Sequence, residues 1–273
     1  MIKFFRKIRL TLLSEDKTGK YFKYAIGEII LVVIGILIAL QINNWNENRK
    51  KTKIGTQYLT EMRFELQNDI NQLDFYINDL KKSIKNQDAA LNTKDISKLS
   101  IDSLSMIIHT INLDFKISEL TFTKMNNLGI TSLSNNDSLN LKITEYYNSD
   151  VVRLKLAMNY IFNDLVKRTD FYIYDQNKID IVNTYSNQKF SSLHNQSEEE
   201  LKNEQRNNII DFIQSINGRN IIQYDLSGKE YSLSILNEFK QKTTTLLKII
   251  YDELKINNPK LEPLPSFQSE NEK

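Results

Sequence analysis

Few side chains in this sequence have the type and spacing that catalysis or metal binding requires. Its two histidines, His109 and His194, lie far apart, and neither has a second ligand at the spacing of a metal site. The polar residues from Arg168 to Asp175 could line a pocket, but a capped helix end with surface ion pairs explains them more simply. The run Glu198-Glu199-Glu200 suits a solvated first helical turn. We therefore predict no catalytic, cofactor-binding or metal-binding residues, and a protein that is not an enzyme.

Composition excludes several further kinds of chemistry. The chain has no cysteine, so it has no disulfide, thiolate metal site or cysteine nucleophile. Residues 1–23 carry seven Lys or Arg against two acidic residues, whereas residues 54–273 carry a net charge of −5. A mildly acidic main domain argues against a nucleic-acid-binding surface.

One run of residues near the start of the sequence is long and apolar enough to form a transmembrane helix. Every residue from Ile29 to Leu40 is apolar or glycine, and the 18 residues from Ala25 to Ile42 would form a helix of about 27 Å. Tyr24 stands at one end and Trp45 at the other, as in the aromatic belts of membrane interfaces. No small-x-small cleavage site follows, so a cleaved signal peptide is disfavoured. We predict a transmembrane helix at residues 24–42.

Three residues within this predicted anchor have alternative interpretations. Glu28 is a carboxylate one turn into the apolar run, where charges are often functional. Near the interface, pairing with Lys20, Lys23 or Tyr24 is the simpler explanation. Gly35 and Ala39 form a small-xxx-small pair that lets two helices approach closely, although such pairs also arise by chance.

The charges that flank the run indicate its orientation. Seven Lys or Arg precede it and four follow within about twenty residues. The richer side is expected in the cytoplasm, so residues 1–23 form a basic cytoplasmic segment and the main domain is periplasmic, anchored in the inner (plasma) membrane. Residues 2–13 fit either a basic amphipathic helix on anionic lipid or a flexible tail.

The rest of the sequence predicts helices. All three prolines lie in the last fifteen residues. Apolar residues recur at helical spacing from Tyr58 to Ile84, which predicts a helix at 56–91 that is nearly continuous with the anchor. Further helices are expected at 100–111, 118–128, 139–173, 198–216 and 233–254, with Gly129 and Asn217-Gly218 ending two of them and Asn135 to Asp137 capping another. Residues 176–196 are expected to form a loop.

These elements predict an all-α fold, in which a single N-terminal transmembrane helix precedes an elongated antiparallel helical bundle. We expect a juxtamembrane connector at 43–55, a helical extramembrane domain at 56–256 and a mobile proline-containing tail at 257–273.

The opening of the chain resembles a known bacterial membrane-protein family. The stretch GKYFKYAIGEIILVVIGILIALQINNWNE, from Gly19 to Glu47, is similar to the start of domain of unknown function 6090. The resemblance is strong over residues 1–50 and looser at Leu128-Gly129 and from Asp137 to Tyr147. It implies an integral membrane protein with no assigned activity and no catalytic residues.

The predicted function follows from these absences. We expect a membrane-anchored interaction or scaffold module with no cofactor. Its partners would be the lipid bilayer and either another protein or a second copy of the chain, and not a nucleic acid. The alternative is an extracytoplasmic ligand-sensing domain that signals through the anchor to a partner protein.

Overall fold

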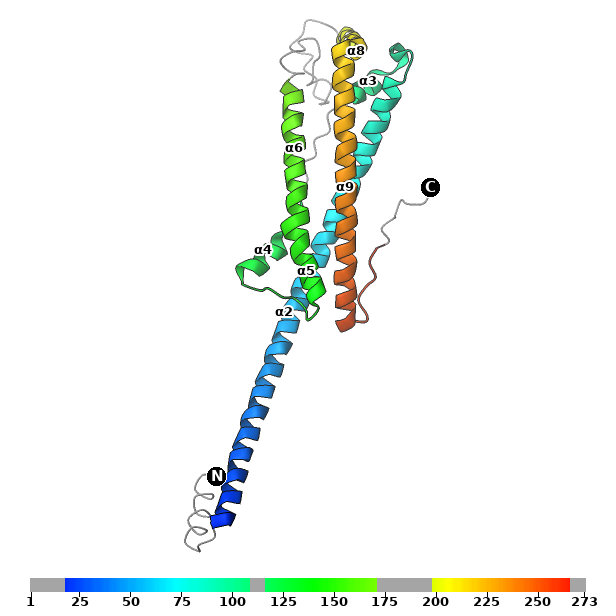
Figure 1. Ribbon diagram of the computed structural model, residues 1–273. Helices are drawn as coiled ribbons and strands as arrows, with labels where there is room; N and C mark the ends of the chain where they lie inside the picture. The colour runs from blue at the N-terminus through cyan, green and yellow to red at the C-terminus, as the bar shows by residue number, and fades with distance from the viewer. Residues whose placement is uncertain (1–17, 109–115, 171–197, 266–273) are drawn as a thin grey trace. The chain divides into compact units, whose positions relative to one another are not determined.

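The structure is a computed structural model that describes residues 18–108, 116–170 and 198–265. Every regular element in these ranges is a helix, which confirms the predicted all-α fold (Figure 1). The predictions for residues 2–13, His109, the loop at 176–196 and His194 lie outside the described residues.

The helices come in two groups along the chain. The first group contains α2 (Thr18–Leu91), a short 3-10 turn (Ile96–Lys98) and α3 (Ile101–Ile108). The second contains α4 (Leu120–Asn127), α5 (Asp137–Glu145), the π-helical turn η2 (Tyr146–Asp150), α6 (Val151–Asp170), α8 (Glu198–Gln214) and α9 (Ile216–Asn257).

The chain divides into two compact units, residues 1–57 and 58–273, with the division inside α2. In the first unit the described residues form one helix, so the connector predicted at 43–55 is helical as well. Side chains from Ile29 to Ile54 are exposed on every face of this helix. Nothing in the described chain covers the apolar run.

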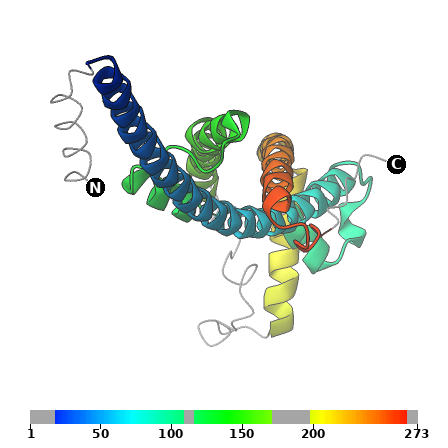
Figure 2. The ribbon, with the colours of Figure 1, turned by 90° about the horizontal axis from the view of Figure 1, so that it is seen from below.

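The second unit is built on one face of α2. This face carries an apolar stripe whose side chains are at most 2% exposed: Leu59, Met62, Leu66, Leu73 and Leu80. The spacing of three and four residues places these side chains along one side of the helix. Seen from below, α6 and α9 both lie on one side of this part of α2 (Figure 2), and they supply the residues that cover the stripe.

The direction of α9 follows from its contacts with α2. The Arg63 guanidinium lies 5.6 Å from the ring centre of Tyr251, and Gln87 donates to Asp225 over 2.7 Å. Rising numbers in α2 therefore meet falling numbers in α9, so the two helices are antiparallel.

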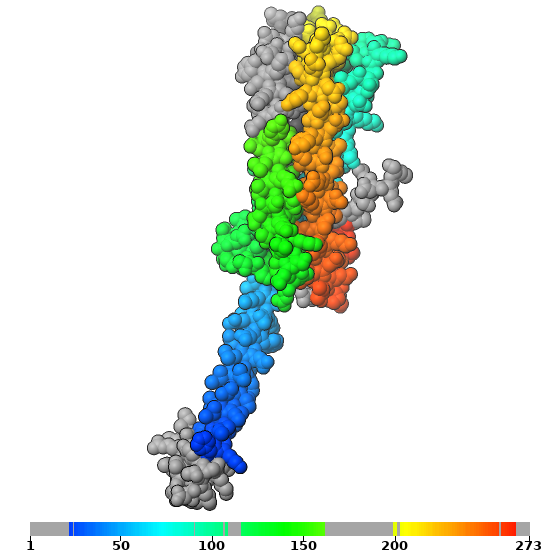
Figure 3. Space-filling view, viewed as in Figure 1, coloured from blue at the N-terminus to red at the C-terminus, as the bar shows by residue number. Residues whose placement is uncertain are grey.

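The α5–α6 segment is antiparallel to α9 by the same criterion. Asn136, which precedes α5, donates to Glu253 over 3.3 Å, and Arg153 of α6 lies 3.8 Å from Glu238. The predicted antiparallel packing thus holds between α9 and both α2 and the α5–α6 segment, while α2 and α5–α6 run in the same direction. Figure 3 shows α6 and α9 side by side on one face.

Two predicted helix caps are confirmed. The Asn136 side chain accepts a hydrogen bond from the Leu139 N–H at 3.2 Å, as an N-cap residue does. Gly129 follows α4 with φ of +67°, a left-handed conformation that glycine adopts without steric cost.

The prediction that Asn217-Gly218 ends a helix is wrong. The break falls at Ser215, whose side chain accepts a hydrogen bond from the Gly218 N–H at 2.9 Å and so caps α9. Asn217 and Gly218 lie in the first turn of α9, which begins 17 residues before the predicted Leu233. The apolar stripe is interrupted here, because polar residues occupy inward positions of α9.

Part of the C-terminal tail packs against the bundle. Leu261 and Leu264 are partly buried against the same core as α2. The Arg63 side chain donates to the Glu262 carbonyl over 3.2 Å. Residues 261–265 have no regular secondary structure, and these contacts tie them to α2, which the sequence did not indicate.

Gly218 provides a test of the α8–α9 junction. A Cβ added at this position would lie 1.8 Å from the Phe212 carbonyl oxygen, and the backbone would have to move. We expect Gly218→Ala to lower the unfolding free energy by about 1–3 kcal/mol, measured by thermal unfolding. Asn217→Ala, at an exposed neighbour, is the control and should be neutral or slightly stabilising. Equal stability of the two variants would contradict the close approach.

Candidate functional site

A π-helical turn joins α5 to α6 and turns two consecutive tyrosines into the core. Tyr146 and Tyr147 are 3% and 2% exposed. A regular α-helix separates adjacent side chains by about 100°, and the extra residue of a π turn changes this phase. Such turns are frequent at functional sites. The adjacent large aromatics at stripe positions are the sequence signal for this feature.

The two phenols have different surroundings. Tyr146 lies 3.0 Å from the Thr243 hydroxyl, and Thr243 gives its only hydrogen to the Phe239 carbonyl at 2.8 Å. Tyr146 is therefore the donor to Thr243. The ring of Tyr147 stacks on Phe122, with 4.4 Å between the ring centres. Its hydroxyl is buried and has no hydrogen-bond partner in the described part of the chain. Burial raises the pKa of both phenols, so both stay neutral.

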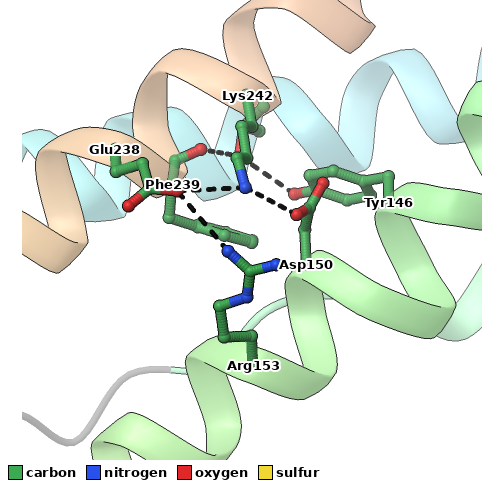
Figure 4. Close-up of polar contacts among 7 residues, drawn as sticks. Tyr146, Asp150, Arg153, Glu238, Phe239 and Lys242 are labelled. Carbon is green, nitrogen blue, oxygen red and sulfur yellow. Dashed lines mark hydrogen bonds and ion pairs between the residues drawn. The ribbon is translucent and has the colours of Figure 1, made fainter.

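An ion-pair chain beside Tyr146 links α6 to α9 (Figure 4). The Lys242 ammonium lies 2.7 Å from Asp150 and 3.0 Å from Glu238, and Glu238 also meets Arg153. Hydrogen bonds to Asp150 and then Glu238 raise the pKa of Lys242. These groups are partly exposed, so their main effect is to set the register of the two helices rather than to add much stability.

Two carboxylates of α2 hold the segment that leads into α4. Glu65 accepts hydrogen bonds from the Thr121 N–H at 3.1 Å and the Thr121 hydroxyl at 2.6 Å. One turn later, Asp69 accepts from the Ser118 N–H at 3.1 Å. Free N–H groups at a helix start need acceptors, and here the acceptors come from a different helix.

A layer of buried polar residues crosses the bundle further along. Gln87 of α2 is 1% exposed, and its amide donates to the Ile107 carbonyl and to Asp225, both at 2.7 Å. Asp225 also meets the Lys229 ammonium at 2.6 Å, with both side chains 6% exposed. The Ser83 hydroxyl and the Gln87 carbonyl oxygen are buried and have no hydrogen-bond partner among the residues that the structure describes.

This polar layer separates two apolar clusters. On one side lies the large core of α2, α5–α6 and α9. On the other lies a smaller core formed by α3, α8 and the first turns of α9. A buried ion pair of this kind contributes little net stability, but it penalises any helix register in which one charge loses its partner.

The predicted anchor residues all lie in the first unit. Gly35 has no atom within 4 Å of an added Cβ, and Ala39 is exposed. Trp45 is 66% exposed, with the Arg49 guanidinium 6.0 Å from its ring centre. Glu28 is partly exposed, and the Tyr24 side chain lies outside the described part. Any pairing of Glu28 at an interface stays a prediction.

The sequence did not predict the buried polar residues Asp69, Gln87, Asp225 and Lys229 or the partly buried Glu65. A signal was present, because Asp69 and Gln87 fall in phase with the apolar stripe of α2. The residues from Arg168 to Asp175 cannot be compared, since their side chains lie outside the described chain. Within the described residues, no cluster of three metal-ligating side chains occurs.

The buried pair gives a prediction for stability. Lys229→Met leaves Asp225 charged inside the bundle, so we expect a loss of about 3–5 kcal/mol in chemical denaturation. Replacing both residues, Asp225→Leu with Lys229→Met, should restore most of that loss. Lys240→Met is the control, because its ion pair with Asp74 is partly exposed and should contribute at most about 1 kcal/mol. A double variant as unstable as Lys229→Met would contradict this account.

Comparison with known proteins identifies a family for this chain but no activity. No curated protein and no solved structure matches it. One described helix is long and apolar enough to cross a membrane. A family model described as a family of unknown function, DUF6090, matches residues 28–166, from the apolar run to most of α6. The chain therefore belongs to the DUF6090 family.

Proposed function

We propose that this protein is a membrane-anchored helical module that binds another protein or a second copy of itself and catalyses no reaction. The observation that supports the anchor is the apolar run in α2, none of which is buried. Exposing a helix that is apolar on all sides to water is costly, whereas a bilayer accepts it. The bilayer is thus the first partner of the module.

The proposed location is the inner membrane, with the N-terminus in the cytoplasm and the helical domain in the periplasm. The seven basic residues of 1–23 support this orientation. Arg49, Lys50, Lys51 and Lys53 weaken the asymmetry but do not reverse it. Trp45 and Arg49, stacked at the end of the run, suit a membrane interface.

A strip of exposed apolar side chains on α6 supports partner binding. Val152, Leu156 and Tyr160 recur every four residues and are 44%, 67% and 67% exposed. This spacing places them on one face of the helix. An apolar helix face that none of the described residues covers fits recognition of a partner helix or groove.

A second candidate function is ligand sensing, with the signal passed through the anchor to a partner protein. The polar layer favours this alternative, because Ser83 and Gln87 place buried oxygens without partners inside the bundle. Unpartnered buried polar groups call for an explanation, and a small polar ligand would provide one. A ligand-dependent rise in the melting temperature of the full-length protein would favour sensing over the interaction module.

The orientation can be tested by cysteine labelling, because the chain has no native cysteine. Ser227 is exposed on α9 and is the site for a reporter, Ser227→Cys. We expect a membrane-impermeant thiol reagent to label this variant in intact cells whose outer membrane has been permeabilised. Ser14→Cys, before the anchor, is the control and should react only after lysis. The opposite pattern would reverse the topology, and extraction by alkaline carbonate would contradict the anchor.

The α6 strip can be tested by changing its charge. We expect Leu156→Lys with Tyr160→Lys to abolish cross-linking of the full-length protein to its partner or to a second copy. Thermal stability should change little, since surface substitutions usually alter it by less than about 0.5 kcal/mol. Asn237→Lys with Gln241→Lys, exposed on α9, is the matched control. Unchanged cross-linking in the α6 variant would exclude this strip as the binding face.

A further inference from the structure

Asp69 is a buried carboxyl group with a single type of hydrogen-bond donor. It is 1% exposed, on the face of α2 that carries Leu66, Ile70 and Leu73. Its two oxygens lie 3.1 and 3.3 Å from the Ser118 N–H nitrogen. Among the residues that the structure describes, no Lys, Arg or His forms an ion pair with it. A buried charge with so little compensation favours the neutral form.

The groups around Asp69 add to this effect. Glu65, one turn earlier on α2, contributes a second negative charge. The other elements packed here bring two neutral phenols and charges that are already paired: Tyr146 and Tyr147 from η2, Glu119 with Lys155, Asp150 with Lys242, and Lys240 with Asp74. The nearby cations are therefore engaged elsewhere.

The balance of these influences places the titration of Asp69 near neutrality. The pKa of Asp69 is raised to about 7 as the net result of three causes: burial raises it most, the hydrogen bond from the Ser118 N–H lowers it, and the charge of Glu65 raises it. In an unfolded or hydrated state the pKa would be about 3.9. The closed state therefore binds the proton more tightly. This stabilisation is complete below about pH 4 and is lost as the pH rises through about 7.

The least costly way to hydrate the ionised carboxylate is to release what covers it. Ser118 precedes α4, a helix of eight residues. The segment is held to α2 by Asp69, by Glu65 and by the ring stack of Phe122 on Tyr147. Short, locally held elements open before a bundle core does.

We propose that Asp69 is a proton-operated latch for α4: with a proton on its carboxyl group, residues 116–127 stay packed on α2, and when the proton leaves, the segment loosens. Opening uncovers Phe122 and Met125, which are 7% and 5% exposed in the closed state. The latch thus couples the pH of the compartment to the exposure of an apolar face. It does not depend on the proposed interaction at α6.

Hydrogen exchange measured by mass spectrometry on the full-length protein in nanodiscs tests the latch. After correction for intrinsic exchange, the protection of peptides covering 116–127 should fall about tenfold per pH unit from pH 5 to 7 and level off above pH 7. Asp69→Asn should keep this protection constant across the range. Asp74→Asn, on the same helix and in a partly exposed ion pair, is the matched control and should keep the wild-type slope.

A direct titration guards against a variant that fails to fold. The side-chain carboxyl carbon of Asp69 in the wild-type protein, followed by NMR, should titrate with a midpoint near 7. A midpoint below about 5, a flat exchange profile in the wild type, or an unchanged slope in folded Asp69→Asn would each overturn the proposal.

Discussion

The helical domain depends on one face of α2 being covered by two helices at once. Met62, Leu66, Ile70 and Leu73 have no measurable exposure, and each such side chain contributes about 1.5–3 kcal/mol when it leaves water. Residues of both α5–α6 and α9 pack against this stripe. Their mutual contacts, through Tyr146 and Thr243 and the ion pairs of Lys242, keep the two covering helices at the separation that α2 requires.

The two buried carboxyl groups, Asp69 of α2 and Asp225 of α9, are stabilised in different ways. Asp225 has Lys229 and Gln87 within hydrogen-bond distance, so its charge is compensated where it lies. Among the described residues, the backbone N–H of Ser118 is the only group that donates to Asp69, so its charge is compensated by a proton. The first arrangement defines which residues of α2 and α9 face each other. The second makes the docking of α4 sensitive to pH, and so the two polar sites have different consequences for dynamics.

The family match includes the apolar run, α2 and most of α6, but not α8 or α9. In this chain the stripe of α2 is closed by residues of α9, such as Leu236, Leu247 and Ile250, which are fully buried. The matched part thus supplies the apolar run and two sides of the core, and α9 supplies the third. If the proposed function holds, partners bind outward faces such as the α6 strip, because the core of the domain is already complete.

Short-range patterns in the sequence determined many of the helices and helix ends of this protein. The apolar run, the α2 stripe, the Asn136 cap and Gly129 follow from side-chain chemistry within a few residues, and sequence alone indicates each of them. Tertiary structure decided the start of α9 at Ile216, the π turn, the shared direction of α2 and α5–α6, and the inward polar side chains. The spacing of apolar residues predicts which apolar side chains face inward, but it does not identify polar side chains that do so. Asp69 accepts a hydrogen bond from Ser118, which lies before α4, and Asp225 accepts one from Gln87 of α2. No short-range pattern records partners so far apart in the sequence.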